Sequence, residues 1–157
     1  MTDVVELPTD ALYEADEHSW IERQIAGLRD GGLDRLDRVN LIAYLTDMAA
    51  RDRRELGSRL IVLYAHILEP RIQPEKATGS WRLTIRERQR AIRRLLKSLP
   101  SLGHRADDIL REVYPDAVET AFDEMGKLTG SDPTAWSEPD FDVAGLFNFD
   151  AGSDGRG

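Results

Sequence analysis

The stretch from Gly79 to Leu102 constrains the fold most, because it combines an apolar stripe with a high density of positive charge. Its large apolar residues recur at spacings of three, four and seven and are Trp81, Ile85, Ile92, Leu95, Leu96 and Leu99. This spacing places them along one side of a helix with 3.6 residues per turn. The sequence therefore predicts a central amphipathic helix with one side facing a core and basic remaining faces.

Two polar residues, Arg88 and Gln89, interrupt the apolar stripe of this helix. A guanidinium beside a core needs a partner, because a buried and unpaired charge is costly. We expect a carboxylate of the acidic N-terminal region to reach Arg88, with Glu14, Asp16 and Glu17 as the first candidates. The alternative is that Arg88 extends to solvent along its apolar stem.

The same helical period recurs along most of the chain and predicts an all-α, single-domain, multi-helix bundle built on a long helical hairpin, with no sheet. The expected helices span residues 10–29, 37–69, 80–98, 101–114 and 116–126. The expected domain organisation is a leader over 1–9, a helical domain over 10–129, and a tail over 130–157 that is docked at first and then disordered. The tail contains too many large apolar residues for a free linker.

The second expected helix is long, and proline and glycine set its limits. Unbroken, it would measure about 48 Å, which exceeds the roughly 15 Å radius of gyration of a compact chain of this size. We therefore expect a bend within Ala49–Gly57, where charged residues and a glycine interrupt the apolar pattern. Pro70 is expected to end the helix.

The charge of the chain is divided unevenly along its length. Residues 1–50 carry 4 basic and 11 acidic side chains, residues 51–105 carry 14 and 5, and residues 106–157 carry 3 and 13. Two acidic regions beside a basic one favour charge pairing within the fold as the first interpretation. Binding of an external polyanion by the basic region is the second interpretation.

Several functional classes find no support in the sequence. The chain has no cysteine, which excludes disulfides, thiolate metal sites and a cysteine nucleophile and agrees with a cytoplasmic location. No signal peptide is recognisable, and no segment approaches the eighteen or so apolar residues of a membrane span. A glycine-rich phosphate loop, a nucleophile elbow and a zinc-protease motif are all absent. We accordingly assign no catalytic residue, and we expect no metal, cofactor or membrane association.

One set of candidate residues is polar and would form a site only if the fold brought its members together. The set comprises Glu14, Asp16, Glu17, His66, Arg88 and Gln89. Within it, His66 and the nearby Glu69 are neighbours on one helical face. A hydrogen-bonded histidine at a helix end is favoured over a metal ligand or a catalytic base, because no third ligand accompanies this pair in the sequence.

A second set of candidates could bind a polyanion and lies on the central helix. It comprises Arg82, Arg86, Arg90, Arg93, Arg94 and Lys97. Three functional hypotheses follow from the two sets. A module that binds a protein partner or another copy of the chain ranks first. Nucleic-acid binding through residues 82–97 ranks second, because the acidic surroundings repel phosphate. An enzyme using the polar set ranks third.

Eight short segments of the chain resemble one protein family. They are Y-E-A-D-E-H-S-W at 13–20, L-D-R-V-N-L-I at 36–42, D-M at 47–48, R-R-E-L-G-S-R-L at 53–60, His66, Q-P at 73–74, S-W-R-L-T-I at 80–85 and P-S-L at 100–102. Over about Tyr13 to Gly126 the chain resembles the family known as domain of unknown function 29, which is common in cyanobacteria and other bacteria. The resemblance implies an all-α fold in a bacterial protein and assigns no activity.

The chain departs from that family at two places. The family usually has several glutamates after the N-L-I segment, where this chain has Ala43, Tyr44 and Thr46. The family's common E-Q-R reads E-R-Q at 87–89. An acidic active site built on those glutamates would lack parts here.

Overall fold

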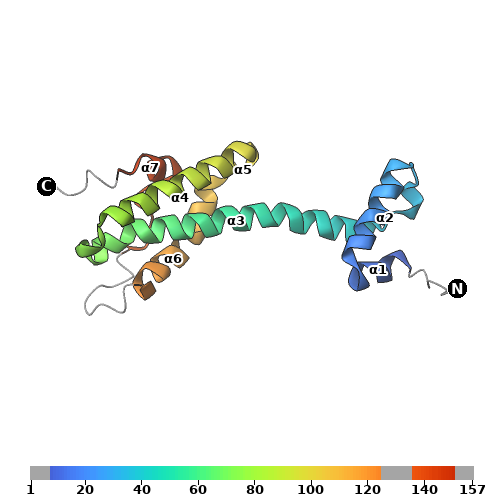
Figure 1. Cartoon of the computed structure of the whole chain (residues 1–157), viewed down its shortest axis with the longest axis horizontal. Coiled ribbons are helices and arrows are strands. Elements are labelled where there is room, and N and C mark those ends of the chain that lie inside the picture. The colour runs from blue at the N-terminus through green and yellow to red at the C-terminus, as the bar shows by residue number, and fades with distance from the viewer. Residues whose placement is uncertain (1–7, 125–135, 151–157) are drawn as a thin grey trace. The chain divides into compact units, whose positions relative to one another are not determined.

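The computed structural model describes residues 8–124 and 136–150, and within them the regular structure is entirely helical (Figure 1). The absence of any strand from these residues confirms the predicted all-α class. The α-helices are α1 (Thr9–Ala15), α2 (Glu17–Arg29), α3 (Arg38–Ile72), α4 (Gly79–Ser98), α5 (Pro100–Gly103), α6 (Ala106–Glu124) and α7 (Val143–Asn148). Two short 3-10 turns, η1 (Leu33–Arg35) and η2 (Pro74–Lys76), precede α3 and α4.

The chain divides into two compact units, Met1–Arg51 and Asp52–Gly157, which we call the N-terminal unit and the C-terminal unit. α3 contributes its first part to one unit and its second part to the other. The single helical domain expected over 10–129 stays a prediction. Residues 1–7 of the expected leader and residues 130–135 and 151–157 of the expected tail lie outside the described residues.

In the N-terminal unit, the single helix expected over 10–29 is instead two helices, α1 and α2, which meet at Asp16. The carboxylate of Asp16 accepts hydrogen bonds from the Ser19 amide at 3.1 Å and from its hydroxyl at 2.7 Å. Aspartate is strongly favoured at this capping position, so Asp16 begins a new helix rather than continuing the old one. Glu14 therefore lies on a different helix from Glu17 and His18, whereas the sequence predicts one helix over residues 10–29.

Trp20 is the centre of the small core in the N-terminal unit. Its side chain is fully buried, and its ring makes an edge contact with Tyr13 at a centroid distance of 4.8 Å and a tilted contact with Tyr44 at 5.6 Å. Tyr13 belongs to α1 and Tyr44 to α3, so the indole connects three helices of this unit. Gly31, with φ +72°, reverses the chain after α2 in a conformation that glycine adopts most easily.

Asp37 joins α2 to the start of α3. Its carboxylate accepts hydrogen bonds from the Trp20 indole at 3.1 Å and from the Asn40 side chain at 2.7 Å, and its own amide donates to the Gln24 side chain at 2.8 Å. Burial acts to raise the pKa of Asp37, but the hydrogen bonds from Asn40 and Trp20 outweigh it and hold the pKa below its usual value. The hydrogen bonds of Asp37 thus fix the start of α3 next to the buried Trp20 indole.

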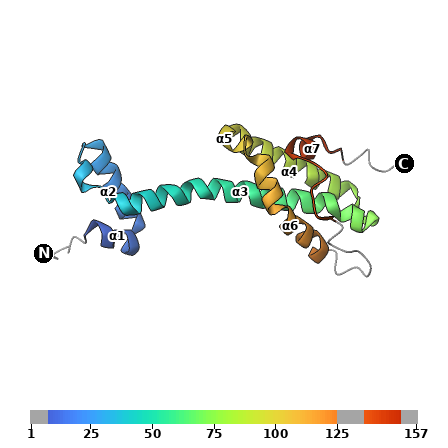
Figure 2. The same cartoon turned by 180° about the vertical axis from the view of Figure 1, so that it is seen from behind.

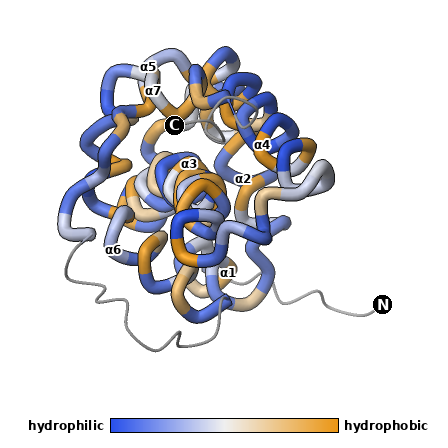
Figure 3. Tube along the Cα trace, turned by 90° about the vertical axis from the view of Figure 1, so that its left-hand side faces the viewer, coloured by the Kyte–Doolittle hydropathy of each residue, from blue (hydrophilic) through white to orange (hydrophobic). Residues whose placement is uncertain are grey.

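In the C-terminal unit, the second part of α3 and α4 form the predicted hairpin, with η2 in the connection, and α6 lies alongside (Figures 1 and 2). α4 alternates hydrophilic and hydrophobic residues as an amphipathic helix should (Figure 3). The residues expected to be buried across the hairpin belong to one core cluster. They are Leu56, Leu60, Leu63 and Ile67 of α3 and Trp81, Ile85, Ile92 and the partly buried Leu96 of α4.

Pro70 does not end α3, which runs on to Ile72 and corrects the sequence prediction. Proline has no N–H and so leaves the carbonyl four residues earlier without its helical partner. That carbonyl belongs to His66, and the indole N–H of Trp81 donates to it at 2.7 Å. The hydrogen bond that proline removes is thereby replaced by one that joins α3 to α4.

The helix break expected at Pro115 is wrong, while the bend expected within Ala49–Gly57 lies in a helical segment and stays a prediction. α3 continues through Ala49–Gly57, where Gly57 is buried and a Cβ in its place would lie 3.2 Å from the Val113 side chain. The glycine therefore serves close packing of α3 on α6. α6 continues through Pro115, and the buried residues Tyr114 and Ala117 on either side of it favour an unbroken helix.

The segment around α7 packs on the other helices of the C-terminal unit through both apolar and polar contacts. Leu146 is fully buried, and the side chain of Gln89 donates to the carbonyls of Leu146 at 2.8 Å and Phe149 at 3.1 Å. The Tyr64 hydroxyl accepts a hydrogen bond from the Phe141 amide at 3.2 Å. Gln89 therefore interrupts the apolar stripe of α4 because it holds this C-terminal segment in place.

Candidate functional site

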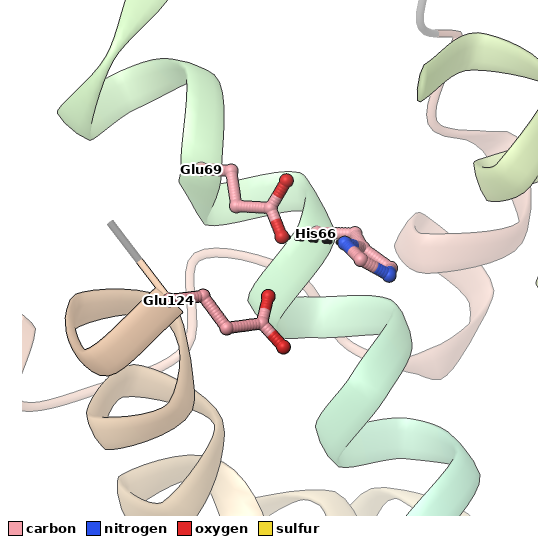
Figure 4. Close-up of side chains that lie close together, drawn as sticks. All are labelled: His66, Glu69 and Glu124. Atoms are coloured by element: carbon pink, nitrogen blue, oxygen red, sulfur yellow. Dashed lines mark hydrogen bonds and ion pairs between the residues drawn. The ribbon is translucent and has the colours of Figure 1, made fainter. Parts of the chain in front are cut away.

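Three metal-ligand or acid-base side chains meet where α3 and α6 lie side by side (Figure 4). His66 and Glu69 come from α3 and Glu124 is the last residue of α6. One ligand atom from each residue lies within 4.8 Å of the other two. His66 Nδ1 and Glu69 Oε1 are 2.5 Å apart, and the Glu124 carboxylate points toward this pair. We call these three residues the His-Glu-Glu cluster.

Glu69 is the buried member of the His-Glu-Glu cluster. Its side chain is 8% exposed, compared with 20% for His66, whereas Glu124 is exposed. Burial raises the pKa of Glu69, the neighbouring Glu124 carboxylate raises it further, and the hydrogen bond from His66 opposes the rise only in part. The cluster therefore holds a carboxylate whose negative charge is disfavoured unless a proton or a cation accompanies it.

The local sequence explains why His66 and Glu69 are held in place. A spacing of three residues puts both side chains on one face of α3. The bond from the Trp81 indole to the His66 carbonyl fixes the backbone at the same point. The predicted hydrogen-bonded histidine is therefore present, and α6 adds the third side chain that the sequence could not indicate.

The candidate polar residues from the sequence are divided between the two units. Asp16 caps α2 and is engaged by Ser19, while Glu14 and Glu17 are exposed in the N-terminal unit. His66 joins the cluster and Gln89 binds the segment around α7, both in the C-terminal unit. An enzyme site built from these residues stays a hypothesis.

Arg88 is half-buried, and its Nε atom is buried without a hydrogen-bond partner among the described residues. Arg88 lines a hollow of about 630 Å³ on α4, together with Thr84, Glu87, Arg90, Ala91 and Arg94. The carboxylate partner expected from the N-terminal unit stays a prediction.

The basic residues of α4 do not all face solvent freely. Arg93 donates to the Phe147 carbonyl at 2.6 Å, and its guanidinium lies 5.1 Å from the centre of the Phe147 ring. That contact holds the segment around α7. The other five members of the candidate polyanion-binding set are also exposed, and Arg82 makes further interactions. These five are Arg82, Arg86, Arg90, Arg94 and Lys97.

One part of the N-terminal unit exposes large apolar side chains. Among the described residues, eight large apolar side chains are exposed, and seven of them lie between residues 25 and 48. These seven are Ile25, Leu28, Leu33, Val39, Ile42, Leu45 and Met48. We call them the apolar face of the N-terminal unit. The helical period does not reveal this exposure, because it predicts which residues share a side of a helix but not whether another element covers that side.

The family of the chain follows from comparison with known proteins. A family model described as domain of unknown function DUF29 matches residues 12–138. The chain belongs to this family. A search of curated proteins and a search of solved structures gave no match. All three residues of the His-Glu-Glu cluster and the whole apolar face lie within the stretch that matches DUF29.

A helix that spans a membrane needs about 20 predominantly apolar residues. Within residues 8–124 and 136–150, no helix of this DUF29 chain is both long enough and apolar enough to cross a bilayer.

Proposed function

We propose that this DUF29 chain is a self-association module in which a second copy packs against the apolar face of the N-terminal unit. The observation that carries the proposal is the concentration of seven of the eight exposed large apolar side chains between residues 25 and 48. Single exposed apolar residues are ordinary, whereas exposed apolar residues that share one side of a helix, as Ile42, Leu45 and Met48 do at spacings of three, mark an interaction surface.

The first part of α3 supplies the centre of the proposed interface. Ile42 is 64% exposed and Leu45 is 55% exposed, and Met48 follows at a spacing of three. This apolar pattern continues along α3 into Leu56 and Leu60, which are fully buried in the C-terminal unit. The same side of one helix is therefore covered in its second part and uncovered in its first, and a partner that covers the first part buries the rest of the pattern.

Charge complementarity favours a second copy as the occupant. Arg38 and Asp52 each lie seven residues from Leu45, which is close to two helical turns, so all three share one side of α3. If two antiparallel copies of α3 cross at Leu45 on a two-fold axis, Arg38 of each copy faces Asp52 of the other. Such an interface is self-complementary, as the contact in a two-fold dimer must be.

The proposal is tested by sedimentation equilibrium of the full chain and the variant Leu45→Glu. Burying one leucine contributes about 1.5–3 kcal/mol, and the substitution changes both copies at once, so the dissociation constant should rise by about 100-fold or more. Leu83→Glu is the matched control, because Leu83 is 62% exposed but lies on α4, outside the apolar face. It should leave the dissociation constant unchanged.

The alternatives give different results in sedimentation equilibrium and in a DNA-binding measurement. A monomeric wild-type chain at all concentrations contradicts the proposal. Weakening by Leu83→Glu as strong as by Leu45→Glu would place the contact on α4 instead. Salt-dependent binding of a DNA duplex that Arg90→Glu abolishes, in a monomeric chain, would favour the nucleic-acid alternative. The expected cytoplasmic location stays a prediction.

Charge reversal tests the orientation of the two copies separately. Arg38→Glu should weaken self-association, because it places two carboxylates opposite each other at both ends of the interface. Combining it with Asp52→Arg restores opposite charges in the antiparallel arrangement and should recover the wild-type dissociation constant. Failure of the double variant to recover would reject the antiparallel pairing.

A further inference from the structure

The His-Glu-Glu cluster belongs to the C-terminal unit and has a chemistry of its own. It brings together one imidazole nitrogen and two carboxylates from two helices, within 4.8 Å of one another. We infer that His66, Glu69 and Glu124 form a binding site for a divalent transition-metal ion of the zinc type. This site is independent of the proposed self-association.

The charges around Glu69 favour a cation at this position. Glu69 is 8% exposed and faces a second carboxylate, that of Glu124. Among the described residues, no lysine or arginine forms an ion pair with either glutamate, and His66 is the only basic side chain paired with Glu69. Two adjacent carboxylates with one histidine carry excess negative charge, which a divalent ion neutralises while bonding all three.

The donor atoms determine the class of metal. Calcium and magnesium prefer oxygen donors alone, and soft ions prefer thiolates, which the chain lacks. One imidazole and two carboxylates suit zinc, which binds both donor types at about 2.0–2.2 Å and in open sites keeps a water as its fourth ligand. Divalent cobalt and manganese are chemically related alternatives. Manganese binds such sites more weakly and prefers oxygen donors.

The geometry must adjust to hold such an ion, because His66 Nδ1 and Glu69 Oε1 are 2.5 Å apart and two tetrahedral ligands of zinc are about 3.4 Å apart. Two donors bonded to one ion at about 2.2 Å each can lie at most about 4.4 Å apart. The ligand atoms of the three residues now lie within 4.8 Å of one another, so the widest separation must shrink slightly. Glu124 can supply this movement, because it is exposed and ends α6. The metal takes the Nδ1 lone pair of neutral His66, whose proton then resides on Nε2, the nitrogen that points away from both carboxylates in Figure 4.

Isothermal titration of the untagged, full-length chain with Zn²⁺ tests the inference. We expect one zinc ion per chain, with an affinity that falls by at least about 10–100-fold in His66→Gln and in Glu124→Gln, since loss even of an outer partner has effects of that size. Glu124→Gln is the decisive variant, because its exposed position allows the fold to persist. Zinc should also raise the melting temperature of the wild type and not that of Glu124→Gln.

Two control variants separate this site from ordinary surface binding. Glu119→Gln removes an exposed carboxylate from the same helix, α6. His18→Gln removes the exposed His18–Glu22 pair, which offers zinc two ligands at a separation of 3.5 Å. Both should retain the wild-type affinity. Absence of zinc binding, equal binding by Glu124→Gln, or loss of binding in His18→Gln would each overturn the inference.

Discussion

Trp20→Ala is expected to destabilise the N-terminal unit by about 3–5 kcal/mol, the usual cost of removing a buried tryptophan. The indole is fully buried, contacts Tyr13 and Tyr44, and donates to Asp37. Its loss opens a cavity between three helices and removes one of the hydrogen bonds at the start of α3. Chemical denaturation followed by circular dichroism measures the free energy of unfolding.

The matched control for Trp20→Ala is Glu22→Ala on the same helix. Glu22 is exposed, so this substitution should change the free energy of unfolding by less than about 0.5 kcal/mol. Hydrogen exchange of the amides of α2 should accelerate in the first variant and not in the second. A loss below about 0.5 kcal/mol for Trp20→Ala would mean that the indole is not the centre of this unit.

Ile92→Ala should cost the C-terminal unit about 2–5 kcal/mol. Ile92 is fully buried in the core cluster that α4 forms with α3 and α6. Its neighbour Arg90 is exposed, and Arg90→Ala should have an effect of less than about 0.5 kcal/mol. If the two variants are equally stable, the wrong side of α4 has been placed against the core.

Much of the fold was predictable because it depends on helical periodicity. The central helix, its buried residues and the hairpin all follow from spacings of three, four and seven residues. The errors concern local competition that the period does not describe. Asp16 ends one helix by capping the next, and Pro70 stays within α3 because the Trp81 indole takes over the carbonyl that proline leaves free.

The candidate sites were less accessible to sequence reasoning, for two physical reasons. Helical spacing relates His66 to Glu69, but Glu124 joins them through tertiary packing of α6 on α3, which no local pattern reveals. Periodicity likewise groups Ile42 and Leu45 with the core residues of α3, because an exposed stripe awaiting a partner has the same sequence pattern as a buried one.

Disulfide formation between single introduced cysteines tests the proposed self-association most directly, since the chain has no cysteine of its own. Identical residues meet where a two-fold axis passes between copies, and a disulfide requires Cα atoms within about 7 Å. Under mild oxidation, Leu45→Cys should form covalent dimers rapidly, while the similarly exposed Leu83→Cys should remain monomeric. Equal rates of dimer formation by the two variants, or no dimer from Leu45→Cys, would contradict the interface at α3.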